Sequence, residues 1–541
     1  MRSRHLLFSA LLLASSCADP ASVSDSDSDF TEADQGKGDN FYSSDTYEYF
    51  VSGQSQVTIE DDLKDATAEV KLGRARELMD LKNIVIGWFL HVRLVDKEVG
   101  DAAHTDANST SYPGFHGMVR DGQYVDDSLK ALSDGLSYSF AFRLQVAGPQ
   151  DLMNVLPGTL KGTQKTFTLE MGKISNEDMS HIDAESEWFR GGMWDSGSFD
   201  PSKLDPSLLE TVDLIVERQV TDNDAYPDLQ KLVSDGKLDI DLHYGWDYWS
   251  RYDISLSREL YGYLTGKGFV SPAASYDKYD GIQGPLTKKI SLGGKSVAVN
   301  VRIFHGADEM GGPGPAPGTD AGAIEMENRM YASLASSEVV IFKGHAGNYY
   351  GFALADWKRT ARGALDYPAL ESAKMPADKY QIVMAAGCQT FSTGQAFRQN
   401  TSKPNFANLN VITTTTFSSA SDNNDIYGLL SGLFDSTQTF QPITWGNIVG
   451  KMNGSTDLGA MFGVHGIDSD PHLSPFARPD LFGKSCKTVA DCGGAGNRCT
   501  TSSAGGKVCS AVCTYSDACP KNFRCAQVAK GTKIVESQCL K

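Results

Sequence analysis

Eight of the ten cysteines of this 541-residue chain lie after residue 485, and this uneven distribution limits what each part can fold into. Cys388 is the single cysteine of the long middle part, and Cys17 ends an apolar N-terminal stretch. Many cysteines in a short Gly- and Ser-rich tail are typical of a disulfide-stabilised module in an exported protein. We therefore expect four disulfides in residues 484–541, with about a hundred pairings open. The cysteines are Cys486, Cys492, Cys499, Cys509, Cys513, Cys519, Cys525 and Cys539.

Zinc binding is the alternative explanation of such a tail. No two of these cysteines have the two-residue spacing of a zinc knuckle, and no histidine follows His472. We therefore expect no metal site here and no cofactor elsewhere. From Cys486 on, the tail carries eight Lys or Arg against three acids, so it is basic although the whole chain has a net charge of −19.

The N-terminus has the order of features found in a secretory signal. Arg2 and Arg4 precede an apolar stretch from Leu6 to Ala14, and small residues lead to Cys17. Residues 13–17 resemble a bacterial lipobox, and that resemblance implies that residues 1–16 are removed and Cys17 is acylated. An ordinary signal with an incidental cysteine is the alternative. The resemblance implies a lipid anchor in the bacterial cell envelope, with the outer membrane favoured.

An acidic segment over residues 17–45 follows the expected anchor. Residues 18–40 hold seven acids, one lysine and few large apolar side chains, so they cannot bury enough surface to fold and should form an extended tether. The negative net charge also argues against a nucleic-acid partner, because phosphate binding needs clustered Lys and Arg. Beyond the N-terminus no apolar run is long enough to span a bilayer, so the lipid anchor would be the only membrane contact.

Residues 46–215 have a strand-like pattern. Residues 138–146 and 166–171 alternate apolar and polar side chains, as a half-solvated antiparallel sheet requires. The stretch Ile84 to Val95 is rich in β-branched and aromatic residues. We expect a β-rich domain with a strand at 84–95, and a β-sandwich is one arrangement that fits this pattern.

Residues 216–480 have a different pattern, in which short apolar runs alternate with helical periodicity. Runs that are apolar throughout are expected of parallel strands buried on both faces, and the helical patterns between them indicate crossover connections. The fold class is therefore an α/β domain with a mostly parallel sheet. Strands are expected at 238–242, 297–304, 339–342, 382–385 and 409–413, and helices at 257–266 and 321–336.

Two reactive side chains follow neighbouring strands of this predicted sheet. His345 comes after the strand 339–342, and Cys388 comes after the strand 382–385. Reactive groups of open parallel sheets gather beyond the carboxyl ends of the strands, so the two side chains could meet there. An imidazole beside a thiol can take its proton and generate a thiolate nucleophile. Backbone N–H groups near Gly347 and Gly387 could then hold an oxyanion.

This pattern resembles the caspase, gingipain, clostripain and legumain group of cysteine peptidases over residues 236–440. The residues that carry the resemblance are an apolar strand leading to Gly344-His345-Ala346-Gly347 and a second leading to Ala386-Gly387-Cys388. The family usually has glycine directly after the histidine, whereas Ala346 intervenes here. The resemblance implies a caspase–haemoglobinase α/β fold, a Cys/His dyad and a peptide or protein substrate.

Three further residues are candidates for a role in this site. His305 also ends a strand and is followed directly by Gly306, so it is a rival base, but a whole helix and another strand separate it from Cys388. Asp422 and Asp425 follow the strand 409–413 and could overhang the cleft, where an acid would select a basic side chain.

The sequence therefore supports two alternative functions. The first is an exported, membrane-anchored cysteine endopeptidase. The second is a non-catalytic surface or adhesion lipoprotein that keeps a peptidase-like scaffold for binding.

Overall fold

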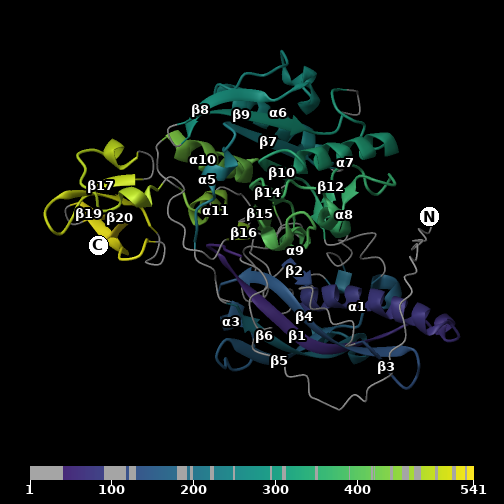
Figure 1. Cartoon of the computed structure of the whole chain (residues 1–541). Coiled ribbons are helices and arrows are strands. Elements are labelled where there is room, and N and C mark those ends of the chain that lie inside the picture. The colour runs from purple at the N-terminus through teal and green to yellow at the C-terminus, as the bar shows by residue number, and fades with distance from the viewer. Residues whose placement is uncertain are drawn as a thin grey trace, which may run out of the picture. The chain divides into compact units, whose positions relative to one another are not determined.

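The computed structural model describes most of the chain from residue 41 onward (Figure 1). Within these residues no helix is long and apolar enough to cross a membrane. The described residues are 41–90, 117–120, 129–150, 152–179, 192–194, 199–219, 224–247, 250–292, 295–307, 312–347, 351–388, 390–415, 418, 421–438, 443–453, 462–467, 477–493, 497–513, 519–530 and 533–541.

An antiparallel sheet dominates the first third of the described chain. Its strand order is β2-β4-β1-β6-β5, with β3 paired to β4. The strands predicted at 138–146 and 166–171 are confirmed as β4 and β5. The strands are β1 (Thr46–Thr58), β2 (Gly117–Arg120), β3 (Lys130–Ala131), β4 (Ser137–Pro149), β5 (Gln164–Gly172) and β6 (Leu209–Arg218), and a short helix α3 (Leu152–Val155) follows β4.

The strand expected at 84–95 is wrong over residues 84–90, which end the long helix α1 (Ala68–Leu90). The helix begins in a run of good helix formers and continues through the β-branched stretch. Leu78, Leu81, Val85 and Phe89 recur at steps of three and four residues, and all four are buried against the sheet. In the described residues α1 therefore covers the sheet face where a sandwich would need a second sheet.

The α/β region is confirmed, and its described residues form a seven-stranded sheet in the order β16-β15-β14-β10-β7-β9-β8. The five central strands are parallel, and the two edge strands are antiparallel. Each of the five strands predicted here is present. They are β7 (Lys237–Tyr244), β9 (Lys295–Phe304), β10 (Val339–Lys343), β14 (Gln381–Ala386) and β15 (Leu409–Thr414), with β8 (Leu286–Leu292) and β16 (Phe462–His465) at the edges.

Helices cover both faces of this sheet (Figure 1). Along β10, Val339 and Ile341 pack with α6, α10 and α11, whereas Val340 and Phe342 pack with α7, α8 and α9. Burial on both faces explains why residues 339–342 of this strand are all apolar. The helices are α5 (Leu229–Leu232), α6 (Tyr252–Gly266), α7 (Asp320–Leu334), α8 (Tyr367–Ser372), α9 (Phe391–Arg398), α10 (Asn424–Gln438) and α11 (Trp445–Asn453).

The order of the parallel strands locates a possible site. The chain passes from β7 to β9 on one side and then returns to place β10 on the other side of β7. The crevice beyond the carboxyl ends of the strands at such a reversal is where open α/β sheets bind ligands. In this sheet the reversal lies between β7 and β10.

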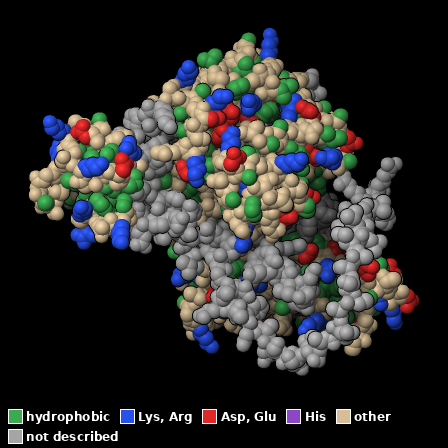
Figure 2. Space-filling view, viewed as in Figure 1, with side chains coloured by type: hydrophobic (Ala, Val, Ile, Leu, Met, Phe, Trp, Pro, Cys, Tyr) green, Lys and Arg blue, Asp and Glu red, His purple; other side chains and the backbone are tan. Residues whose placement is uncertain are grey.

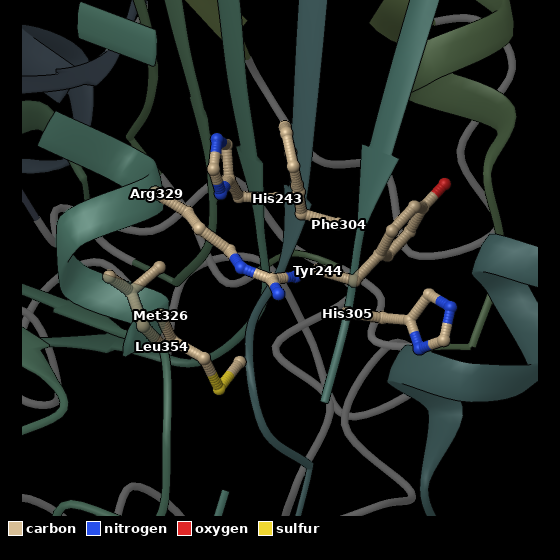
Figure 3. Close-up of a pocket in the computed structure, with 7 residues that line it drawn as sticks. All are labelled: His243, Tyr244, Phe304, His305, Met326, Arg329 and Leu354. Atoms are coloured by element: carbon tan, nitrogen blue, oxygen red, sulfur yellow. The ribbon is translucent and has the colours of Figure 1, made fainter. Parts of the chain in front are cut away.

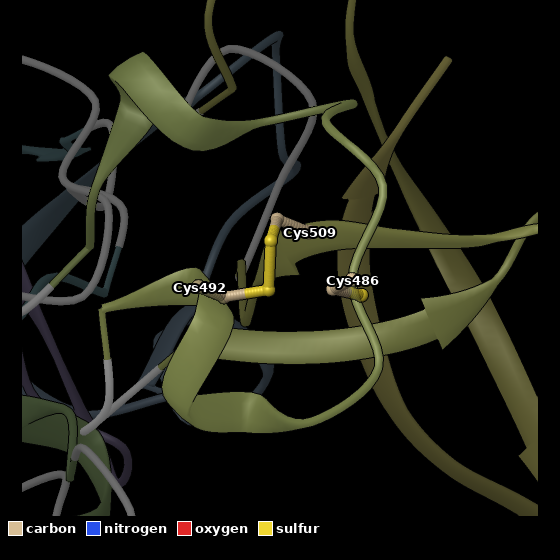
Figure 4. A group of neighbouring side chains, drawn as sticks. All are labelled: Cys486, Cys492 and Cys509. Atoms are coloured by element: carbon tan, nitrogen blue, oxygen red, sulfur yellow. A yellow bond between two sulfur atoms is a disulfide. The ribbon is translucent and has the colours of Figure 1, made fainter.

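The expected disulfides of the C-terminal tail are confirmed, and they form two repeats. In each repeat the first cysteine pairs with the third and the second with the fourth, and the third and fourth lie opposite each other on a hairpin. The sulfurs of Cys486, Cys492 and Cys509 lie within 4.8 Å of one another, but each already belongs to a disulfide (Figure 4). The bonds are Cys486–Cys499, Cys492–Cys509, Cys513–Cys525 and Cys519–Cys539, on the hairpins β17 (Asn497–Thr501)–β18 (Lys507–Ala511) and β19 (Arg524–Lys530)–β20 (Lys533–Leu540).

Candidate active site

The register of β10 and β14 brings the two reactive side chains to the same level of the sheet. The parallel pairing runs from Val339 opposite Ile382 to Lys343 opposite Ala386. His345 and Cys388 each lie two residues beyond the last of these pairs. The Gly344 N–H still donates to the Ala386 carbonyl oxygen at 3.1 Å, so the two backbone segments remain adjacent beyond the end of β10.

Gly387 allows this close approach. A Cβ atom at this position would lie 2.6 Å from the Ala346 Cβ and 2.8 Å from the Gly344 carbonyl oxygen, which is too close for any side chain. The Gly387 carbonyl oxygen accepts a hydrogen bond of 2.6 Å from the Thr414 hydroxyl of β15. The residue before Cys388 is therefore fixed on both sides, against the His345 loop and against the next strand.

Asp247 is the member of this group that the sequence analysis missed. It follows β7, and its Oδ1 accepts a hydrogen bond from His345 Nε2 at 3.0 Å. Its Oδ2 accepts from the backbone N–H groups of Ser250 at 2.8 Å and of Tyr252 at 3.2 Å, at the start of α6. The carboxylate thus orients the imidazole while it is itself anchored to a helix.

These contacts also set the charge of Asp247. Burial opposes ionisation, but the hydrogen bonds from His345, Ser250 and Tyr252 together lower the pKa of Asp247 from 3.8 to about 2. The carboxylate is therefore ionised at neutral pH and can only accept. Nε2 of His345 therefore donates to Asp247.

Cys388 is half-buried and is the one cysteine of the described residues that is outside a disulfide. Its thiol points to the Ser418 carbonyl oxygen, 3.9 Å from the sulfur. Helix α9 begins three residues later, and the amino end of a helix stabilises nearby negative charge.

Gly347 lies in a small hairpin directly after His345. Strand β11 (Ala346–Gly347) pairs with β12 (Gly351–Ala353), which pairs in turn with β13 (Ala364–Leu365). The Ala353 N–H donates to the His345 carbonyl oxygen at 3.0 Å, which fixes the backbone of His345. The oxyanion role expected for Gly347 and Gly387 stays a prediction.

His305 lies apart from Cys388. It ends β9, and two strands, β7 and β10, separate β9 from β14, so at normal spacing the two positions are about 14 Å apart. His305 is buried against Tyr276, its Nδ1 donates to the Gly306 carbonyl oxygen at 2.9 Å, and burial lowers its pKa. It lines a small cavity at the ends of β7 and β9, where its ring is directed away from His243 and Arg329 (Figure 3).

The two candidate specificity residues differ in their surroundings. Asp425 is fully buried and forms an ion pair with Lys343 at 2.8 Å, so the expectation that it faces a substrate is wrong. Asp422 is half-buried, and its Oδ1 accepts from the Asn424 N–H at 2.9 Å. Its Oδ2 is buried and has no hydrogen-bond partner among the described residues.

The proposed lipidation residue, Cys17, lies outside the described residues, as does the acidic segment up to residue 40. Comparison of the chain with protein-family models, with characterised proteins and with solved structures finds no match. The case for a function therefore depends on the geometry of the site.

Changing Asp247 to asparagine should test its link to His345. Loss of the charge-assisted hydrogen bond should lower kcat/KM for a peptide roughly 10- to 100-fold. Because the folded-state pKa of Asp247 is depressed, its stabilising contribution of about 2 kcal/mol is present above pH 3.8 and is lost as pH falls toward 2. Urea unfolding should therefore separate the variant from the parent at pH 7 but not at pH 2. Asp228→Asn, at the exposed cap of α5, is the matched control and should leave kcat/KM unchanged.

Proposed function

We propose that the chain is an exported, lipid-anchored cysteine endopeptidase in which Cys388 is the nucleophile, His345 the base and Asp247 the residue that orients the base. The single observation that carries this proposal is the Asp247–His345 hydrogen bond at the level of Cys388. Nucleophilic acyl transfer can use a carboxylate that orients an imidazole and an imidazole that deprotonates a thiol, and these three groups are present here.

The acylation step uses these groups as follows. The Cys388 sulfur attacks the carbonyl carbon of the peptide bond, and the thiol proton passes to Nδ1 of His345. The C–N bond then breaks, and the imidazolium gives its proton to the departing amine, leaving a thioester on Cys388. Asp247 stabilises the imidazolium through Nε2 in both halves of this step.

Water completes the reaction. It attacks the thioester carbonyl and gives a proton to His345, which returns it to the Cys388 sulfur as the carboxylic acid leaves. Backbone N–H groups near Gly347 and at Cys388 are the proposed oxyanion donors, a contribution on the order of 3 kcal/mol.

The resemblance to the caspase, gingipain, clostripain and legumain group remains part of the proposal. Two features support it: an open α/β sheet covered by helices on both faces, and a histidine and a cysteine after adjacent parallel strands. The non-catalytic surface lipoprotein is the competing function, and it predicts a thiol that reacts slowly at neutral pH.

The proposed anchor has a direct test. Cys17→Ala should release the protein from the membrane fraction in soluble form, because the acyl chain would have no attachment point. Cell fractionation of the parent and the variant measures this. Retention of Cys17→Ala in the membrane would contradict the anchor.

The proposed substrate carries a basic side chain beside the scissile bond, and Asp422 is the residue that selects it. Asp422→Asn should lower kcat/KM for peptides with Lys or Arg at that position by roughly 10- to 100-fold, as expected for loss of a charged hydrogen bond. Peptides with a neutral side chain there should be cleaved at the parent rate. Equal losses on both peptide series would show that Asp422 acts only as a cap of α10.

A further inference from the structure

The C-terminal module exposes an unusual combination of side chains at the end of its second hairpin. Lys533, Ile534 and Val535 are consecutive and all exposed, Ile534 at 56% and Val535 at 53%. The register shifts at this point, and Val535 has no partner across the strands.

The C-terminal module also carries an excess of positive charge. In the described tail each acid is already engaged: Asp480 pairs with Arg478, Glu536 pairs with Arg498, and Asp491 accepts from the backbone of residues 487 and 488. Figure 2 shows Lys and Arg side chains at several places on this module. Exposed cations for which the described residues supply no ion pair include Lys487, Lys507, Lys521, Arg524 and Lys533.

We propose that the end of the β19–β20 hairpin is a contact site for an anionic phospholipid surface. Lysines are drawn to lipid phosphates, but a soluble polyanion offers nothing to two exposed aliphatic side chains. A bilayer interface satisfies both, because Ile534 and Val535 leave water while Lys533 stays at the headgroups. At physiological ionic strength charges more than about 8 Å from that surface are largely screened, so the acidic remainder of the chain does not prevent this contact.

The site would complement the proposed lipid anchor. The contact itself does not depend on Cys17 or on the proposed peptidase activity, so it can be tested without either.

The experiment uses the chain from Asp39 to Lys541, which forms a compact unit separate from residues 1–38. Co-sedimentation is measured with phosphatidylcholine vesicles and with vesicles that also contain phosphatidylglycerol. Binding is expected only to the second kind and should weaken with added salt. Ile534→Ser with Val535→Ser should weaken binding at least about tenfold, and Lys533→Gln should weaken it about fivefold.

Matched controls lie elsewhere on the chain. Val270→Ser with Ile282→Ser removes aliphatic side chains that are 69% and 65% exposed, and Lys237→Gln removes an exposed lysine. Neither should change vesicle binding. The proposal is overturned if the parent does not bind the anionic vesicles, if the hairpin variants bind as the parent does, or if heparin binds as tightly and is insensitive to the two aliphatic changes.

Discussion

Peptide hydrolysis should disappear in Cys388→Ala and in His345→Ala, with kcat/KM lower by at least about 10⁴-fold in each. Removing the sulfur removes the atom that forms the thioester, and removing the imidazole removes the group that carries the proton in both directions. A fluorogenic peptide assay at neutral pH measures the loss. Cys388→Ala should unfold at the same urea concentration as the parent. His345→Ala should unfold at a somewhat lower one, because it removes the hydrogen bond to the buried Asp247.

His305→Ala is the matched control for this result. It removes a histidine that follows a parallel strand of the same sheet, but two strands lie between that strand and the one before Cys388, so hydrolysis should persist. If His305→Ala abolishes hydrolysis while His345→Ala spares it, the base is misassigned. If no peptide is cleaved and iodoacetamide labels Cys388 only slowly in the folded protein, the binding-scaffold function is the better explanation.

Asp425→Asn should destabilise the protein by about 3–5 kcal/mol, measured by urea unfolding. The change leaves the Lys343 ammonium buried without its partner, because both side chains of this ion pair are almost fully inaccessible to water. The double variant Lys343→Met with Asp425→Leu should recover most of the loss, since it removes both charges together. Asp422→Asn should cost about 1 kcal/mol, as expected for a half-buried residue that caps a helix. A loss of similar size from both acids would contradict the distinct roles assigned to them.

The central sheet and its two reactive strand ends could be predicted because a strand buried on both faces requires an uninterrupted run of apolar residues, which is easy to recognise in a sequence. Residues 339–342 and 382–386 are apolar at every position, and the rule that reactive groups gather at carboxyl ends then selects His345 and Cys388. Asp247 could have been found by the same rule, since it follows β7. It was missed because its position depends on Gly245, which turns the chain so that a Cβ would lie 2.3 Å from the Ala353 carbonyl oxygen.

Other features could not be inferred from residue types. The stretch from Ile84 to Leu90 favours a strand locally, and only the helix that precedes it extends the helical hydrogen bonding through it. Asp422 and Asp425 are identical side chains three residues apart, and nothing in the sequence shows that Lys343 reaches only the second. Composition also could not assign the pairing of the tail, which depends on the strand register of the two hairpins.

The crossed pairing within each repeat of the tail has a consequence for covalent topology. A cut anywhere between Cys486 and Cys509 leaves both fragments tied by at least one of the two crossing bonds, and the same holds between Cys513 and Cys539. Only the short connection at residues 510–512 lacks such a bridge, and there Ser510 and Ala511 are fully buried. A nicked module would therefore migrate as one intact chain until a reductant is added, and the protein could lose surface peptide bonds in this region without shedding it.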